Sequence, residues 1–303
     1  MKHIHIALIG GQIYPVYLGI ADEQPDKVIL VHSEESKPEA KRIKQEVERN
    51  LQAKVLSQSL SPVDVPQIFH QIQALSEQII TPDNAYTINL TSGTKPWSIA
   101  FYHYFSPMPN VKLIYIDQNG CISDLKTLES RLSKVGLDMD LIFRLNGTPS
   151  IVEYEKISDG RLEKCPIAKE LLAKWFERYI AKLLYQWKWS KEVRLNVKFP
   201  YSEQAKVKNE IDVIVNSGNR LLFVECKSGG FSPIDVDKFR TVVKNYGGMA
   251  CKALFITYKP MTQEVLEKCA DSGIVACSIA DHNKVPGELY QMLEEELFKI
   301  NKK

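Results

Sequence analysis

The chain has 303 residues, 44% of them apolar and 25% charged, which is enough for about two domains with substantial cores. Its formal charge of +2 excludes a uniformly basic nucleic-acid-binding protein, so any cationic surface must be local. The six cysteines include no close pair of the kind that zinc sites and redox motifs need, and the N-terminus lacks a signal-peptide or membrane-spanning stretch. We therefore expect a cytoplasmic protein with no membrane association.

The first part of the chain alternates short apolar runs with segments of helical spacing. Residues 38–51 place Ile43 and Val47 four apart among lysines and glutamates, and a later stripe contains Ile68 and Ile72. Such alternation predicts a parallel sheet with crossover helices, that is, a Rossmann-like α/β domain. The apolar runs lie at residues 4–9, 27–32, 86–91 and 111–117.

The third of these runs breaks into a loop, Ser92–Lys95, that leads into a helix. Thr94 suits the position before a helix and Pro96 suits its first turn. The loop therefore directs backbone N–H groups, a helix N-terminus, hydroxyls and one lysine to a single place. This combination is typical of a site for an anionic phosphate group, although the sequence is not a Walker motif.

Two further loops follow the first two strands, Gly10–Tyr14 and His32–Glu34. Turn chemistry alone explains a Gly-Gly loop. All three loops nevertheless share the carboxyl edge of the predicted parallel sheet, where ligands of such folds bind.

The stretch Asn89–Lys95, together with the early Gly10–Gly11 loop, resembles CARF domains, the CRISPR-associated Rossmann-like sensors of cyclic oligoadenylates. The resemblance implies a cyclic oligoadenylate ligand. The residues that it implies as ligand contacts are Gly11, Gln12, Ser33, Thr91, Ser92, Gly93, Thr94 and Lys95.

The pattern changes after Asp117, where residues 118–120 mark a turn and only short strand-like pieces follow up to about Lys164. We expect a sensor domain at residues 1–125, a linker at 126–164 and a second domain at 165–303. A long amphipathic helix from about Pro166 to Trp187 would supply the core of that second domain. The strands expected to follow are 193–199, 211–215, 221–226 and 253–257, with a helix at 234–246.

Charged residues interrupt two of these apolar strands. Period-two alternation puts Glu225 and Lys227 on one face, and the turn at residues 216–219 can pair the strands and bring Asp212 beside Glu225. Two such carboxylates repel one another, and a divalent cation with a preference for hard oxygen ligands, Mg²⁺ or Mn²⁺, removes that repulsion. A solvated salt bridge at the strand ends is the structural alternative.

Asp212, twelve residues and then Glu225-Cys226-Lys227 resembles the PD-(D/E)XK superfamily of restriction-endonuclease-like nucleases, which have a mixed-sheet α/β fold. The resemblance implies that Asp212 and Glu225 bind metal and that Lys227 assists catalysis. The Trp175-Phe176-Glu177 segment resembles the helix that often supplies a further acidic ligand, so Glu177 is a candidate catalytic and metal-binding residue or an exposed helical glutamate. Glu210 is either a supporting group or solvated.

With both domains joined, the chain resembles the ancillary nucleases of type III CRISPR systems, which are dimers switched on by cyclic tetra-adenylate. A twofold dimer would present two copies of the Ser92–Lys95 loop to a ring with an even number of nucleotides, four or alternatively six. We expect a ligand-gated, metal-dependent endonuclease that acts on RNA or DNA in antiviral defence. The alternatives are a constitutive DNA endonuclease of restriction or repair type and a non-catalytic cyclic-nucleotide sensor.

Overall fold

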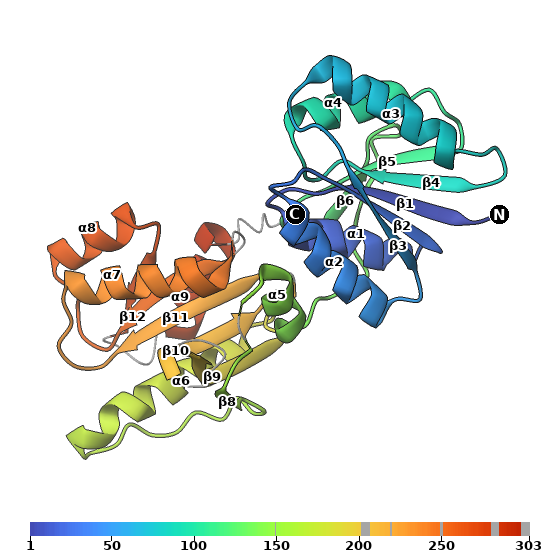
Figure 1. The fold of residues 1–303 in the computed structure, drawn as a ribbon. Helices are drawn as coiled ribbons and strands as arrows, with labels where there is room; N and C mark the ends of the chain where they lie inside the picture. The colour runs from blue at the N-terminus through green and yellow to red at the C-terminus, as the bar shows by residue number, and fades with distance from the viewer. Residues whose placement is uncertain (149, 201–206, 219, 249–250, 280–284, 298–303) are drawn as a thin grey trace. The chain divides into compact units, whose positions relative to one another are not determined.

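The computed structural model divides into two compact units, one of residues 1–137 with 144–147 and one of residues 138–143 with 148–303 (Figure 1). We call them the first and the second unit. The residues that the structure describes are 1–148, 150–200, 207–218, 220–248, 251–279 and 285–297.

The first unit contains a seven-stranded sheet in the order β3-β2-β1-β4-β5-β6-β7. Neighbours from β3 to β5 are parallel, and β6 and β7 continue the sheet antiparallel. The predicted Rossmann-like parallel sheet is therefore confirmed. Its strands are β1 (His3–Leu8), β2 (Lys27–His32), β3 (Lys54–Ser59), β4 (Ala85–Asn89), β5 (Val111–Ile116), β6 (Cys121–Asp124) and β7 (Ser130–Leu132).

Helices cover both faces of this sheet, with α3 and α4 on one side and α1 and α2 on the other (Figure 1). Ile68 and Ile72 of α3 and Trp97 of α4 pack onto Ile6 and Ile88 of the central strands. This packing removes the apolar stripe of α3 from water, as its sequence spacing predicts. The helices are α1 (Ile13–Glu23), α2 (Lys37–Asn50), α3 (Val65–Ile79) and α4 (Lys95–Phe105).

His5 of β1 is fully buried, and neither ring nitrogen has a hydrogen-bond partner within the described residues. Burial lowers the pKa of His5 from 6.5 to about 3, so the folded protein keeps this ring neutral. The unfolded chain binds a proton below about pH 6.5 and folded His5 does not, so acid favours unfolding.

When the pH falls from about 7 to about 5, we expect His5 alone to lower the free energy of unfolding of the first unit by about 2 kcal/mol. Thermal unfolding of the wild type and of His5→Phe at both pH values measures this loss of stability, because the phenyl ring of the variant cannot bind a proton. An equal loss of stability in the two proteins would contradict the assignment.

The second unit contains a mixed six-stranded sheet in the order β13-β12-β11-β10-β9-β8. The pairs from β8 to β11 are antiparallel and those from β11 to β13 are parallel, which confirms the predicted mixed α/β class. Its strands are β8 (Glu153–Lys156), β9 (Glu192–Pro200), β10 (Val207–Asn216), β11 (Leu221–Lys227), β12 (Lys252–Thr257) and β13 (Val275–Ser278). Its helices are α6 (Leu172–Gln186), α7 (Pro233–Val242), α8 (Gln263–Asp271) and α9 (Val285–Met292).

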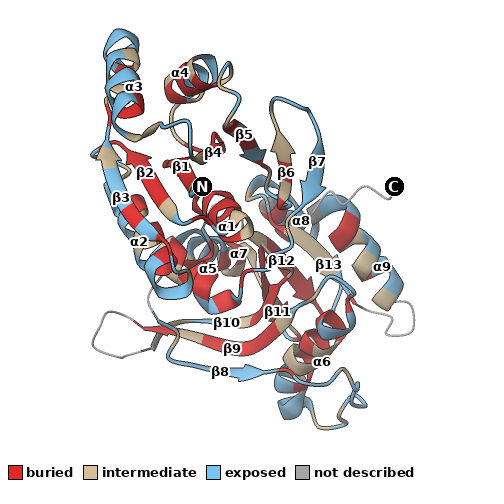
Figure 2. Ribbon diagram, turned by 90° about the vertical axis from the view of Figure 1, so that its right-hand side faces the viewer, coloured by how far each residue is buried: buried red, intermediate tan, exposed pale blue. Residues whose placement is uncertain are grey.

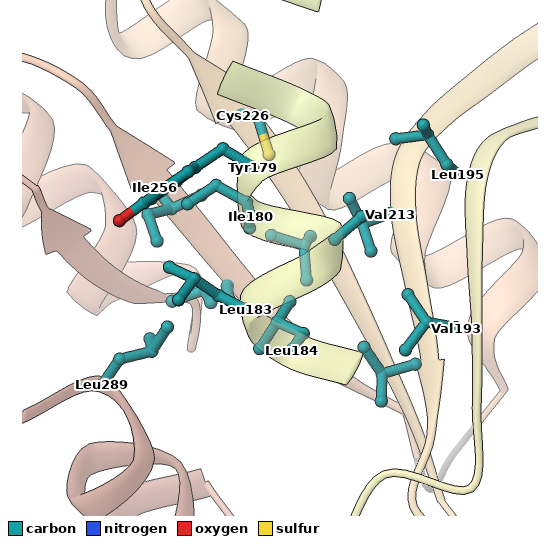
Figure 3. Close-up of a cluster of buried hydrophobic side chains, with 14 of the residues drawn as sticks. Tyr179, Ile180, Leu183, Leu184, Val193, Leu195, Val213, Cys226, Ile256 and Leu289 are labelled. Carbon is teal, nitrogen blue, oxygen red and sulfur yellow. The ribbon is translucent and has the colours of Figure 1, made fainter. Parts of the chain in front are cut away.

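Helix α6 supplies the core on one face of this sheet. Tyr179, Ile180 and Leu184 lie among side chains of the central strands such as Val213 and of α9 such as Leu289 (Figure 3). In both units the buried residues gather along the central strands, and the exposed ones lie on edge strands such as β8 and on outer helix faces such as that of α3 (Figure 2). Within the described residues, no helix is both long and apolar enough to cross a bilayer.

One predicted helix boundary differs from the structure. Helix α6 starts at Leu172 rather than near Pro166, because residues 169–171 form a single 3-10 turn whose Leu171 is exposed instead of packed on the sheet. The stretch 126–164, expected to be a linker of short strand-like pieces, contains β7, α5 (Met139–Asn146) and β8.

Candidate functional site

Strands β10 and β11 bring two carboxylates face to face in the second unit. Val213 pairs with Val224 in the antiparallel register, so Asp212 and Glu225 are the next opposed residues. Oδ2 of Asp212 accepts a hydrogen bond of 2.7 Å from the backbone N–H of Cys226. This bond holds the carboxylate of Asp212 against the backbone of β11. Asp212 and Glu225 are both half-buried.

The environment of this pair disfavours two negative charges. Burial, and then the charge of Glu225, raise the pKa of Asp212 well above its ordinary value. Burial also raises the pKa of Glu225, against the opposing effect of Lys227. Since a bound cation favours the charged form of both groups, the arrangement fits a divalent cation with hard oxygen ligands.

Lys227 lies two residues after Glu225 and on the same face of β11. Its Nζ donates to Oε1 of Glu225 at 2.6 Å. Burial lowers the pKa of Lys227, but the charge and the hydrogen bond of Glu225 outweigh burial and leave that pKa raised. The lysine is therefore a fixed cation at the carboxylate pair, whereas Val224 and Cys226 point into the core beneath α6.

Glu177 lies on α6 and is half-buried. Burial, and then the charge of Glu210, raise its pKa, with further effects from Lys227 and Glu225. Its electrostatic environment thus includes the residues of the site. Among the described residues, however, no three His, Cys, Asp or Glu side chains are grouped so that they could hold a metal ion, so the carboxylate pair of Asp212 and Glu225 is the core of the candidate site.

The loop after β4 in the first unit is held by its own side chains. Thr91 donates its backbone N–H to Oδ1 of Asn89, and its hydroxyl accepts from the backbone N–H of Ile116. Thr94 is the residue before α4, as predicted, and its hydroxyl accepts from the backbone N–H of Trp97 at 3.4 Å. The hydroxyls of Thr91 and Thr94 therefore shape the loop.

Gly93 has a backbone φ of +85°, a left-handed conformation that favours glycine. The loop after β1 approaches it closely, because a Cβ at Gly10 would lie 2.8 Å from the backbone nitrogen of Gly93. The backbone N–H of Gln12 donates to the hydroxyl of Ser92 at 3.4 Å. The loops after β1 and β4 are therefore in direct contact at the carboxyl edge of the sheet.

A cavity of about 710 Å³ opens beside these two loops. Five of the predicted ligand residues line it, and Lys95 among them is exposed. Within the described residues no carboxylate pairs with Lys95, so its ammonium group can meet an anion. The predicted residues in the lining are Gln12, Thr91, Ser92, Gly93 and Lys95.

Three predicted contacts lie elsewhere. Ser33 is buried, exchanges hydrogen bonds with Ser36 and lines a separate cavity of about 390 Å³. Thr94 donates its hydroxyl to the carbonyl of Pro62 and does not line the larger cavity. Gly11 is exposed and is not part of that lining.

Sequence reasoning missed seven of the twelve residues that line the cavity. The unpredicted part of the lining comes from the residue after β4, from α4, from β5 and from the residue after β6. The helical spacing after Thr94 was a usable signal, because residues one turn apart share a helix face. The missed residues are Leu90, Ser98, Ile99, Tyr102, His103, Tyr115 and Leu125.

Two models of known protein families match the chain, one within each unit. Residues 4–134 match the Card1 CARF domain, and residues 167–296 match the Card1-like endonuclease domain. No curated protein matches the sequence.

Solved structures of similar fold cover nearly the whole chain. Can2 from Sulfobacillus thermosulfidooxidans, in complex with cyclic tetra-adenylate, is 19% identical, with a TM-score of 0.74 over 97% of this chain and 99% of that one. Protein VC1899 from Vibrio cholerae is 13% identical, with a TM-score of 0.77 over 96% of this chain and 98% of that one.

A type III CRISPR defence DNA nuclease activated by cyclic oligoadenylate is 15% identical, with a TM-score of 0.65. That match covers 98% of this chain but 52% of the nuclease, so this chain spans about half its length. At such low identities these likenesses show the fold, and the two matched domains give the family: the chain belongs to the proteins that join a Card1-type CARF domain to a Card1-like endonuclease domain.

Proposed function

We propose that this chain is a metal-dependent endonuclease switched on by a cyclic oligoadenylate, first of all cyclic tetra-adenylate. We propose further that it cleaves RNA, DNA or both as a cytoplasmic homodimer in type III CRISPR antiviral defence. One observation carries the proposal. The same chain joins a CARF domain, with a cavity beside an anion-binding type of loop, to an endonuclease domain whose strands oppose Asp212 and Glu225.

The residues of the second unit fit hydrolysis of a phosphodiester. Asp212 and Glu225 would hold Mg²⁺ or Mn²⁺, which when bound acidifies a water molecule and neutralises charge on the phosphate. Lys227, fixed by its hydrogen bond to Glu225, would orient the attacking water and stabilise the charge that develops in the transition state. Glu177 would act as a further acidic group from α6.

The residues of the first unit fit control by an anionic ligand. The Ser92–Lys95 loop offers backbone N–H groups, the N-terminus of α4 and an exposed lysine to a phosphate. In a twofold dimer, two such cavities would bind the two equivalent halves of one cyclic oligoadenylate. A ligand that binds the active arrangement more tightly shifts the population toward it, and this preference is sufficient for activation.

The test is to titrate purified protein with cyclic tetra-adenylate over labelled RNA and DNA, with Mn²⁺, with Mg²⁺ and with chelator. Cleavage that requires both ligand and metal is the expected result. Cleavage without ligand would instead support a constitutive endonuclease, and ligand binding without cleavage would support a sensor alone. Cyclic hexa-adenylate in a parallel titration decides the ring size.

A further inference from the structure

The cavity of the first unit is lined by two chemically different kinds of residue. Residues of the Ser92–Lys95 loop bring hydroxyls, backbone N–H groups and the ammonium group of Lys95. Beyond the loop, Ser98 and His103 are polar, whereas Ile99, Tyr102, Tyr115 and Leu125 are apolar or aromatic. A phosphate group alone would leave the apolar and aromatic residues unused.

Tyr102 and Tyr115 are not needed for the core of the domain. The core-facing side of α4 carries Trp97, Phe101 and Phe105, which are at most 1% exposed. Tyr102 lies on the outer side of the same helix and is 43% exposed, and Tyr115 of β5 is 41% exposed. Two large aromatic rings thus border the cavity with much of their surface in water.

Aromatic rings beside a phosphate-binding loop match the two parts of a nucleotide. Phosphate contacts hold the backbone of a nucleic acid in place, whereas contacts to bases carry information about base identity. Tyrosine rings stack on bases, and each such stack contributes substantially to affinity. The spacing along α4 also fits, because Ser98 and Tyr102 are one turn apart and line the same cavity.

We propose that Tyr102 and Tyr115 form the base-binding wall of this cavity. The inference rests on the proposed function, and it adds that these rings favour a purine such as adenine over a pyrimidine, because the larger purine surface stacks better. The Ser92–Lys95 loop then holds the ring backbone without regard to the base.

The experiment measures dissociation constants of cyclic tetra-adenylate and cyclic tetra-uridylate for the full chain by calorimetry, at about 50 and about 200 mM salt. The variants are Tyr102→Ala, Tyr102→Phe and Lys95→Ala. Tyr185→Ala is the matched control, because it removes a tyrosine that is 39% exposed on a helix, α6, outside the cavity. Sedimentation velocity of each variant records its oligomeric state.

We expect Tyr102→Ala to weaken binding of cyclic tetra-adenylate by about 5- to 150-fold, the contribution of one base stack. The salt dependence should stay as in the wild type, and Tyr102→Phe and Tyr185→Ala should bind within about twofold of it. Lys95→Ala should weaken both ligands alike and flatten the salt dependence. The wild type should bind the uridylate ring more weakly than the adenylate ring.

Three outcomes overturn the inference. Tyr102→Ala with unchanged affinity shows that the ring does not contact the base, while the proposed function stands. Loss of affinity together with loss of the dimer shows that Tyr102 packs against a second copy instead. A wild type that does not bind cyclic tetra-adenylate removes both this inference and the proposed activator.

Discussion

Glu225→Gln is expected to abolish strand cleavage, with a fall in kcat of about 1,000-fold, equivalent to about 4 kcal/mol of transition-state stabilisation. The substitution keeps the shape of the side chain but removes one of the two opposed carboxylates, which are the groups that we propose to hold a divalent cation. It also removes the carboxylate that holds Nζ of Lys227 at 2.6 Å. The measurements are single-turnover cleavage with saturating cyclic tetra-adenylate and Mn²⁺ affinity by calorimetry.

The matched control is Glu264→Gln, at an exposed residue in the first turn of α8. It should cleave and bind Mn²⁺ as the wild type does. Both variants should bind cyclic tetra-adenylate normally, because neither change lies in the first unit. Wild-type cleavage by Glu225→Gln would refute the assignment of the carboxylate pair as the active site.

Gly93→Ala is expected to destabilise the first unit by about 2–4 kcal/mol, from left-handed backbone strain together with overpacking. The backbone φ of +85° disfavours any side chain. A Cβ would also lie 2.9 Å from Cε3 of Trp97 and 3.0 Å from Cβ of Leu8, and both of these side chains are buried and cannot yield easily. Denaturant unfolding measures the loss, and calorimetry should show weaker binding of cyclic tetra-adenylate because the loop lines the cavity.

Gly136→Ala serves as the control in the same unit. A Cβ there would meet no atom within 4 Å, and its backbone φ is not positive, so the change should stay within about 0.5 kcal/mol of the wild type. If Gly93→Ala were as stable as Gly136→Ala, the close packing of the loop on Trp97 would not constrain this position.

The strands were easier to predict than some of the helices. Apolar runs such as that of β2 are buried after their first residue, so hydrophobicity alone reveals them. Helix α1 escaped prediction because nine of its eleven residues are buried, and a helix that is apolar on most sides shows no stripe. Strand β3 escaped for the opposite reason, since only Val55 of its six residues is buried at the edge of the sheet.

The opposed carboxylates of the candidate site could be predicted because hairpin geometry is local. A short turn and period-two alternation suffice to set Asp212 opposite Glu225. The cavity of the first unit depends on tertiary packing instead. Tyr115 reaches the lining from a different strand, and Ser33 is withdrawn from it by hydrogen bonds to Ser36, and neither fact has a signature in the sequence.

The antiparallel register of β10 and β11 also determines where this chain can accept inserted residues. One residue added within either strand would turn its carboxylate to the α6 side, where the charge would meet an apolar core. The tip of the hairpin is not bound by that register, and within the described residues a Cβ at Gly218 would meet no atom within 4 Å. Gly218 itself must stay, because its backbone φ of +104° disfavours any side chain. A short epitope inserted next to Gly218 should therefore leave the two strands paired and the nuclease working, and this position offers a handle for following the protein in cells.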